Sequence, residues 1–149
     1  GLVFVSAGYL RSDLLAIRPD GRGDVTDTHV VWRASKGAPL GPALLALGDE
    51  LYAVNQAGLA TCWDARTGQV HWQEKIGGPH SAAPLAANGR LYFLAESGTT
   101  TVLKAGREFT VLATNLLDET AFASPAAIEG ALFIRTTHHL YRIGETRPH

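Results

Sequence analysis

The sequence has no methionine, a single cysteine and no excess of basic residues. Because Cys62 has no second cysteine to pair with, an internal disulfide is excluded. The 13 Lys and Arg balance 14 Asp and Glu to a net charge of −1, so no basic surface is expected for nucleic acid. Apolar runs such as residues 43–47 are far shorter than the roughly 20 residues of a membrane-spanning helix. We therefore expect neither a nucleic-acid partner nor a membrane span.

The remaining composition is that of a globular protein. With 46% hydrophobic and 18% charged residues, the 149 residues can form one domain or a piece of a larger one. Residues 1–13 lack the basic start and long apolar core of a signal peptide. Since methionine is absent, we expect the natural start to lie upstream, and the compartment stays unknown.

Three segments that begin at Gly41, Ala82 and Ala123 share one pattern. Their prolines, Pro42, Pro84 and Pro125, are spaced by 42 and 41 residues. Their apolar-aromatic pairs have nearly the same spacing and are Leu51-Tyr52, Leu91-Tyr92 and Leu132-Phe133. An earlier copy, truncated at its front, begins at Gly1, and its Trp32 lies 40 residues before Trp72. The sequence therefore contains a repeat of about 41 residues.

Glycine distinguishes strands from helices in this repeat. The run from Leu44 to Val54 could also be interpreted at helical spacing. However, the 16 glycines recur at the ends of short β-rich runs, and each glycine inside a helix costs about 1 kcal/mol relative to alanine. A complete copy then holds four strands, which in the first complete copy are residues 43–47, 50–55, 59–64 and 70–75. In the next copy they are residues 84–87, 90–96, 99–104 and 109–114. Four strands per copy is typical of a propeller blade.

The predicted fold is an all-β, partial β-propeller of four-stranded antiparallel blades. We expect about 3.5 blades and about 14 strands in a single propeller segment that spans residues 1–149. The predicted blades are residues 1–37 (partial), 38–78, 79–119 and 120–149 (partial). An open arc leaves apolar faces and unpaired strand edges at both ends. We therefore expect a protein partner, or a second copy of the chain, to complete the ring.

The stretch CWDARTGQVHW, residues 62–72, predicts a hairpin loop. Asp64 can accept bonds from the N–H groups that follow it, Thr67 can do so more weakly, and Gly68 can supply the positive φ of a short loop. Trp72 is large enough to fill the wedge between neighbouring blades, and its indole N–H can reach a backbone carbonyl. We interpret the following residues as a structural motif, not a catalytic one: Asp64, Thr67, Gly68, Trp72, Trp32, Pro42, Pro84 and Pro125.

This stretch resembles the tryptophan-docking motif of pyrroloquinoline-quinone-type propeller repeats, which quinoprotein dehydrogenases and BamB-like proteins share. Asp64, Thr67, Gly68 and Trp72 match that motif, whereas Cys62 replaces an alanine and Gln69 a lysine. The likeness covers nearly the whole chain, but only one copy keeps the motif intact. In the next copy it contracts to residues 102–106, and Phe109 or Val111 is expected at the tryptophan position.

The resemblance implies two kinds of protein, and the residues favour the non-catalytic one. A quinone-dependent dehydrogenase of this family needs a calcium ion, a catalytic aspartate and commonly a disulfide between neighbouring cysteines, which one cysteine cannot form. Calcium needs about six to eight oxygen ligands, and the nearest candidate is the acidic loop from Asp20 to Asp27, which we interpret as a solvated loop. We assign no catalytic, cofactor-binding or metal-binding residue. Pyrroloquinoline quinone and calcium are expected only if the chain is part of an enzyme.

The histidines and the cysteine have no partners that suggest chemistry. His138 and His139 are adjacent on a predicted strand and would point to opposite faces, so they cannot chelate one metal there. Turn or surface histidines are the better interpretation. His80 lies in a connection between blades beside Ser81, with no acid at a spacing that suggests a triad. Cys62, on an apolar strand, is interpreted as a small buried hydrophobic residue.

Three functions are compatible with these observations. The leading hypothesis is a non-catalytic propeller segment that acts as a protein-interaction or scaffold module, as the BamB-like resemblance implies. The alternatives are a fragment of a quinone-dependent dehydrogenase whose catalytic residues lie elsewhere, and a sensor propeller of a signalling protein. A periplasmic or extracellular location is implied by the resemblance alone.

Overall fold

The computed structural model describes residues 1–8 and 12–144. These residues form 14 β-strands and no helix, as the spacing of the glycines predicts. No described segment is therefore a helix long and apolar enough to cross a membrane.

Strands that follow one another in the sequence pair antiparallel and form four sheets, which we name blades 1 to 4. Blade 1 contains β1 (Val3–Ala7), β2 (Asp13–Ile17) and β3 (Val30–Ala34). Blade 2 contains β4 (Leu45–Leu47), β5 (Glu50–Val54), β6 (Leu59–Asp64) and β7 (Val70–Lys75). Blade 3 contains β8 (Leu85–Ala87), β9 (Arg90–Leu94), β10 (Thr99–Lys104) and β11 (Val111–Leu116). Blade 4 contains β12 (Ala126–Ile128), β13 (Ala131–Arg135) and β14 (Leu140–Gly144).

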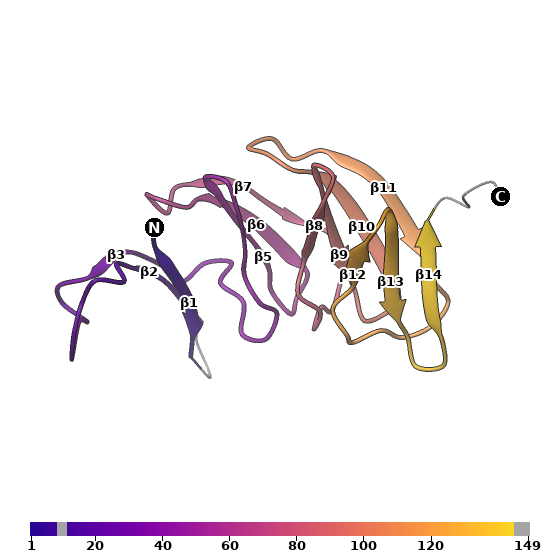
Figure 1. The fold of residues 1–149 in the computed structure, drawn as a ribbon, viewed down its shortest axis with the longest axis horizontal. Coiled ribbons are helices and arrows are strands. Elements are labelled where there is room, and N and C mark those ends of the chain that lie inside the picture. The colour runs from indigo at the N-terminus through magenta and orange to yellow at the C-terminus, as the bar shows by residue number, and fades with distance from the viewer. Residues whose placement is uncertain (9–11, 145–149) are drawn as a thin grey trace.

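The four blades lie side by side in an open arc, with blades 1 and 4 at its two ends (Figure 1). The short first strands of blades 2, 3 and 4 contact one another in order, β4 against β8 and β8 against β12. Pro42, Pro84 and Pro125 lie just before these three strands. The strand numbers of 3, 4, 4 and 3 confirm the predicted partial propeller.

The strand register makes the blades comparable residue by residue. In blades 1, 2 and 3 the pairing of the last two strands shifts at a bulge. The pairs directly before the bulge are equivalent: Ala16 with Trp32, Cys62 with Trp72, and Val102 with Ala113. Ala113 therefore takes the tryptophan position in blade 3. The prediction of Phe109 or Val111 there is wrong, because β11 begins at Val111 and the predicted strand began too early.

Each pair of neighbouring blades encloses a hydrophobic cluster. Trp32 and Trp63 belong to the cluster between blades 1 and 2, and Trp72 belongs to the cluster between blades 2 and 3. The cluster between blades 3 and 4 contains no tryptophan and has four buried members: Ala82, Leu94, Ala121 and Ile134. The third interface is therefore the least filled of the three.

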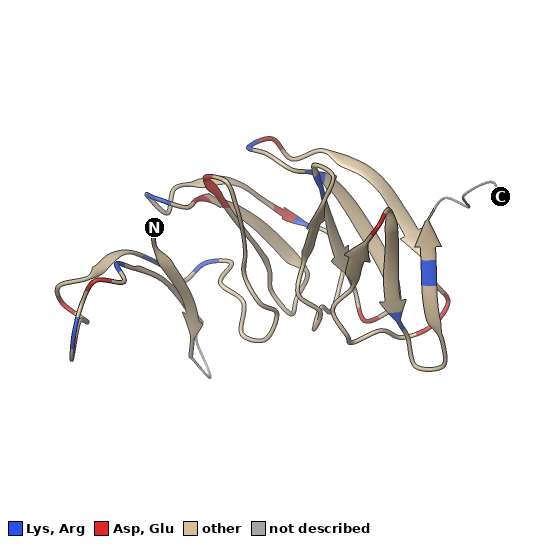
Figure 2. Cartoon of the chain, in the orientation of Figure 1, with Lys and Arg blue, Asp and Glu red and all other residues tan. Residues whose placement is uncertain are grey.

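Charged residues lie chiefly in the turns and near strand ends, with both signs interspersed (Figure 2). His138 and His139 also lie in a turn, between β13 and β14, so the prediction of a strand there is wrong. The backbone N–H of Thr136 donates to the carbonyl of His139 at 2.9 Å, and this bond closes the turn. Both histidines therefore leave the sheet, in agreement with their interpretation as turn residues.

Candidate functional site

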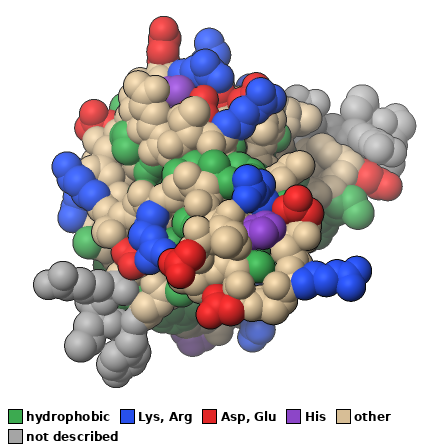
Figure 3. Space-filling model, turned by 90° about the vertical axis from the view of Figure 1, so that its left-hand side faces the viewer, with side chains coloured by type: hydrophobic (Ala, Val, Ile, Leu, Met, Phe, Trp, Pro, Cys, Tyr) green, Lys and Arg blue, Asp and Glu red, His purple; other side chains and the backbone are tan. Residues whose placement is uncertain are grey.

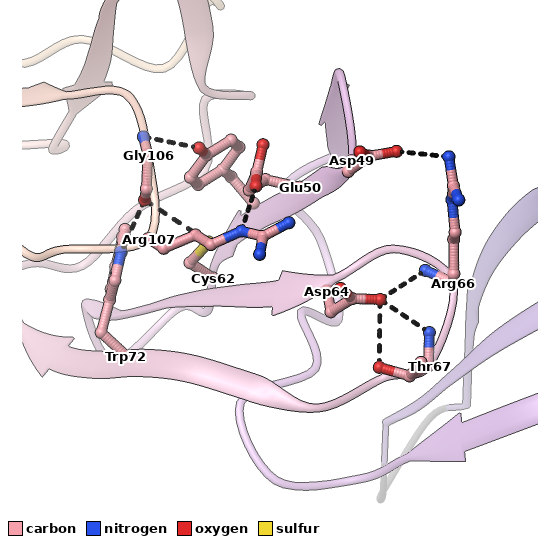
Figure 4. Close-up of polar contacts among 10 residues, drawn as sticks. Asp49, Glu50, Cys62, Asp64, Arg66, Thr67, Trp72, Gly106 and Arg107 are labelled. Carbon is pink, nitrogen blue, oxygen red and sulfur yellow. Dashed lines mark hydrogen bonds and ion pairs between the residues drawn. The ribbon is translucent and has the colours of Figure 1, made fainter.

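The Asp64 carboxylate organises the turn between β6 and β7. Its Oδ1 accepts the backbone N–H of Arg66 at 3.0 Å, the backbone N–H of Thr67 at 2.9 Å and the Thr67 hydroxyl at 3.0 Å (Figure 4). The N–H of Thr67 is the main cause that lowers the pKa of Asp64 from its ordinary value. The N–H of Gly68 also donates to the Asp64 carbonyl at 2.9 Å. The carboxylate is therefore occupied in holding the loop.

This turn is also the docking site for the tryptophan of the preceding blade. The indole N–H of Trp32 donates to the carbonyl of Ala65 at 3.0 Å. Gly68 has a φ of 74°, and a Cβ added to it would lie 2.7 Å from the Trp32 ring. Gly68 thus meets two requirements, the left-handed loop conformation and the close approach of the indole. The sequence indicated only the first, because the second depends on a residue from another blade.

Trp72 repeats the arrangement one blade further along the arc. Its indole N–H donates to the carbonyl of Gly106 at 3.1 Å, and its ring packs edge-on against Phe109 at a centroid distance of 5.3 Å. The N–H of Gly106 donates to the Tyr52 hydroxyl at 2.9 Å, and the Cys62 thiol donates to the Gly106 carbonyl at 3.8 Å (Figure 4). Both polar groups of the Gly106 peptide are thus bound by residues of blade 2.

Charged pairs flank this docking contact at the same end of the strands. Arg107 Nε donates to Glu50 Oε1 at 2.8 Å and so links blade 3 to blade 2. Arg66 pairs with Asp49 at 2.9 Å within blade 2 (Figure 4). Arg66, Asp49 and Arg107 are each more than half exposed, so solvent screens both pairs and weakens their contribution to stability.

Cys62 is a buried part of the core. Its side chain is fully buried, and burial is the main cause that raises the pKa of its thiol to about 12. Burial likewise raises the pKa of Tyr52 to about 12. A thiol of this kind stays protonated at neutral pH and is a poor nucleophile.

At the opposite ends of the strands, His80 is buried in the connection between blades 2 and 3. Only 1% of its surface is exposed, and both ring nitrogens lack a partner among the described residues. Its backbone N–H donates to the carbonyl of Gln56 at 3.3 Å. The neighbouring Ser81 hydroxyl is bound by Glu96. Burial lowers the pKa of His80, so the ring is neutral in the folded chain at neutral pH.

Glu119 is the centre of a polar cluster that joins the connection after β11 to blade 4. Its carboxylate accepts the Thr136 hydroxyl at 2.5 Å, the His138 backbone N–H at 3.2 Å and the Tyr141 hydroxyl at 3.3 Å. The ring of His139 also contacts it through Nδ1. The Thr136 hydroxyl is the main cause that lowers the pKa of Glu119 to about 2. No sequence motif indicated this cluster, because its members come from separate segments.

The residues of the predicted calcium candidate are bound within their own loop. Asp24 accepts the backbone N–H of Thr26 at 3.0 Å, and Asp20 lies 3.5 Å from the ring of His29. Within residues 1–8 and 12–144, no three His, Cys, Asp or Glu side chains converge as metal ligands. The oxygens of this donor set, which point to different local partners, do not fit a calcium-bound quinone.

The comparisons with known proteins identify the family. The family model of the outer membrane protein assembly factor BamB matches residues 22–111, which is more than half of the 149 residues. The chain belongs to the BamB family. This confirms the resemblance to pyrroloquinoline-quinone-like propeller repeats that residues 62–72 indicated. No curated protein matches the sequence.

Solved structures share the fold of this BamB-family chain at low sequence identity. The crystal structure of BamB from Moraxella catarrhalis has a TM-score of 0.70 and 18% identity over 91% of this chain and 40% of that chain. A europium-containing methanol dehydrogenase has a TM-score of 0.56 and 14% identity over 76% of this chain and 22% of that one. The computationally designed Ika4 protein has a TM-score of 0.63 and 13% identity over 89% of this chain and 86% of that one. The chain thus spans less than half of the first two structures.

Replacing Gly68 with alanine tests the tryptophan docking in this BamB-family chain. Gly68→Ala should lower the free energy of unfolding by about 1–2 kcal/mol for the left-handed conformation, and by at least about 1 kcal/mol more because Trp32 is displaced. The matched control is Gly89→Ala, which has a φ of 71° and no atom near the added Cβ. Urea unfolding of both variants measures the difference. Equal losses would contradict the docking role of Gly68.

The buried His80 predicts that stability depends on pH. Because its pKa is lowered from 6.5 in the folded chain, the unfolded chain binds more protons below pH 6.5. The contribution of His80 to stability is therefore complete above that pH and is lost as the pH falls. His80→Leu should reduce the difference in unfolding free energy between about pH 7.5 and about pH 5.5. His138→Leu is the control for an exposed histidine, and an unchanged difference in His80→Leu would refute the prediction.

Proposed function

We propose that this chain is a non-catalytic propeller segment that binds other protein surfaces as an interaction or scaffold module. The observation that carries the proposal is the exposure, at both ends of the arc, of apolar positions that the internal blades bury. Membership of the BamB family supports it, since that family is described as an outer membrane protein assembly factor. If this chain has the role that the family description names, its partner is another protein.

The exposed apolar positions are the same ones that form the contacts between internal blades. Val3 in blade 1 is 48% exposed, whereas its equivalents Leu51 and Leu91 are fully buried against the preceding blade. Leu140 in blade 4 is 69% exposed, whereas its equivalent Ala60 is fully buried. Hydrophobic side chains also reach the surface between charged ones on the blade 1 end of the molecule (Figure 3).

These ends have the chemistry of blade-to-blade contacts, so a further blade is the surface that fits them. Burying apolar area yields about 25 cal/mol per Å², and open sheet edges favour pairing with another chain. The remaining blades can come from the rest of a longer chain or from a second copy. In both cases, the function of the segment is to bind further blades through its two end faces.

Charges placed on the blade 1 end test the proposal. The wild-type chain should self-associate as its concentration rises, and the double change Val3→Lys with Val5→Lys should weaken this association at least about tenfold, because each lysine must lose hydration at the contact. Val70→Lys is the control, since Val70 is 46% exposed on the last strand of an internal blade. Light scattering and sedimentation measure the association. A wild-type chain that stays a non-aggregating monomer would refute the proposal.

A reconstitution experiment addresses the dehydrogenase alternative. The chain is mixed with pyrroloquinoline quinone and calcium, and the quinone spectrum and the reduction of a dye are followed. For an interaction module, we expect neither a red-shifted quinone band nor calcium-dependent dye reduction. Either signal would support the enzyme in place of the scaffold.

A further inference from the structure

Blades 3 and 4 enclose a mainly apolar groove of about 210 Å³. Its walls come from β9 and β10 on one side and from β13 and β14 on the other. The lining residues that matter here are Tyr92, Thr100, Val102, Leu132, Ile134 and Ile143. The groove therefore lies at the third interface of the arc, where the hydrophobic cluster is smallest.

These six residues are the repeat equivalents of side chains that belong to the hydrophobic cluster of Trp72. By strand register, they correspond in order to Tyr52, Ala60, Cys62, Leu91, Phe93 and Leu103. All six of those residues belong to the cluster that contains Trp72. The groove thus lies among the positions that share a cluster with a tryptophan at the second interface.

Ala113 leaves the tryptophan position of the third interface without an indole. It takes the register position of Trp72 but carries a single methyl group. Trp32 and Trp72 fill the first and second interfaces and are only 9% and 7% exposed. Ile143 lies on the edge strand β14 and is 44% exposed, whereas its equivalent Leu103 lies on β10, between two strands, and is fully buried.

We propose that this groove binds an aromatic side chain, tryptophan in the first place, that a protein partner inserts between blades 3 and 4. The inference rests on the proposed function as an interaction module and names the chemistry of one contact. Two observations favour an indole. The same set of positions shares a hydrophobic cluster with an indole at the preceding interface, and a cavity of about 150 Å³ with apolar walls accommodates benzene, so 210 Å³ leaves room for a larger ring.

The groove also offers polar atoms at its wall. Tyr92, Thr100 and Asn115 bring a phenol, a hydroxyl and an amide to the lining. An indole N–H needs one acceptor when it is buried, and these oxygens can accept it. An aromatic side chain presented by a peptide therefore fits the groove better than a purely aliphatic one.

The experiment titrates the full chain with two probes and follows the methyl resonances of Val102, Leu132, Ile134 and Ile143 by NMR. The first probe is the capped peptide Gly-Ser-Trp-Ser-Gly, and the second is the same peptide with alanine in place of tryptophan. The tryptophan peptide should give saturable shifts at these methyl groups, and the alanine peptide should give none. Free indole is a third probe. If indole binds and the tryptophan peptide does not, the groove takes a small molecule and the proposed protein side chain is refuted.

The decisive variant places a tryptophan of the chain itself in the groove. Ala113→Trp should abolish the shifts and raise the denaturation midpoint, because its own indole occupies the volume. Ala57→Trp is the matched control, since Ala57 lies in an exposed turn of blade 2, and it should bind the peptide as the wild type does. Ile143→Glu alters an exposed part of the wall and should weaken binding at least fivefold. Wild-type binding in both Ala113→Trp and Ile143→Glu would overturn the proposal.

This test is independent of the association at the ends of the arc. If the chain self-associates but binds no tryptophan peptide, the groove proposal fails while the interaction module stands. If the peptide binds but the chain stays a monomer, the groove stands as a binding site and the end faces lose their assigned role.

Discussion

The contact on which the arc depends is an indole from one blade packed on the backbone of the next blade's turn. In the two interfaces that contain it, the indole N–H binds a backbone carbonyl, of Ala65 for Trp32 and of Gly106 for Trp72. A buried aromatic side chain of this size removes roughly 150–250 Å² from water, which at about 25 cal/mol per Å² gives roughly 4–6 kcal/mol before the cost of ordering. The charged pair between Arg107 and Glu50, which solvent screens, contributes less.

The same contact explains why the turn residues recur with the tryptophans. Asp64 holds the loop so that the carbonyl of Ala65 faces the preceding blade, and Gly68 leaves room for the ring of Trp32. Trp72 in turn binds the carbonyl of Gly106 in blade 3, and the N–H of Gly106 donates to the Tyr52 hydroxyl. The motif at residues 62–72 thus binds the tryptophan of the preceding blade and contributes a tryptophan that binds the next blade. A chain of such units propagates in one direction around the arc, as is typical of repeat proteins whose units contact only their neighbours.

The fold could be predicted from the sequence because it depends on features that recur at a fixed period. The prolines, the glycines at strand ends and two of the tryptophans are visible without coordinates, and they lead to the observed number of strands. The tryptophan position of blade 3 was predicted wrongly at Phe109 or Val111, because the predicted last strand began at residue 109 and the observed one begins at Val111. Only the register shows that Ala113 takes it. Residues that act once, such as His80 and Glu119, leave no periodic signal, and their roles depend on contacts between distant segments.

The third interface shows how the propeller holds together where the indole is missing. Its apolar cluster has four buried residues, but Glu119 binds the Thr136 hydroxyl, the His138 N–H and the Tyr141 hydroxyl of blade 4. These bonds favour the ionised carboxylate and lower the pKa of Glu119 to about 2. The contribution of this contact to stability is therefore complete above the ordinary carboxyl pKa of the unfolded chain and is lost only as the pH falls toward 2. A polar clamp at the rim can fix two blades while leaving the space between them open. An indole cannot do both, since it fixes the blades by filling that space. At the third interface, the Glu119 cluster therefore holds blades 3 and 4 together, while Ala113 leaves the tryptophan position without an indole.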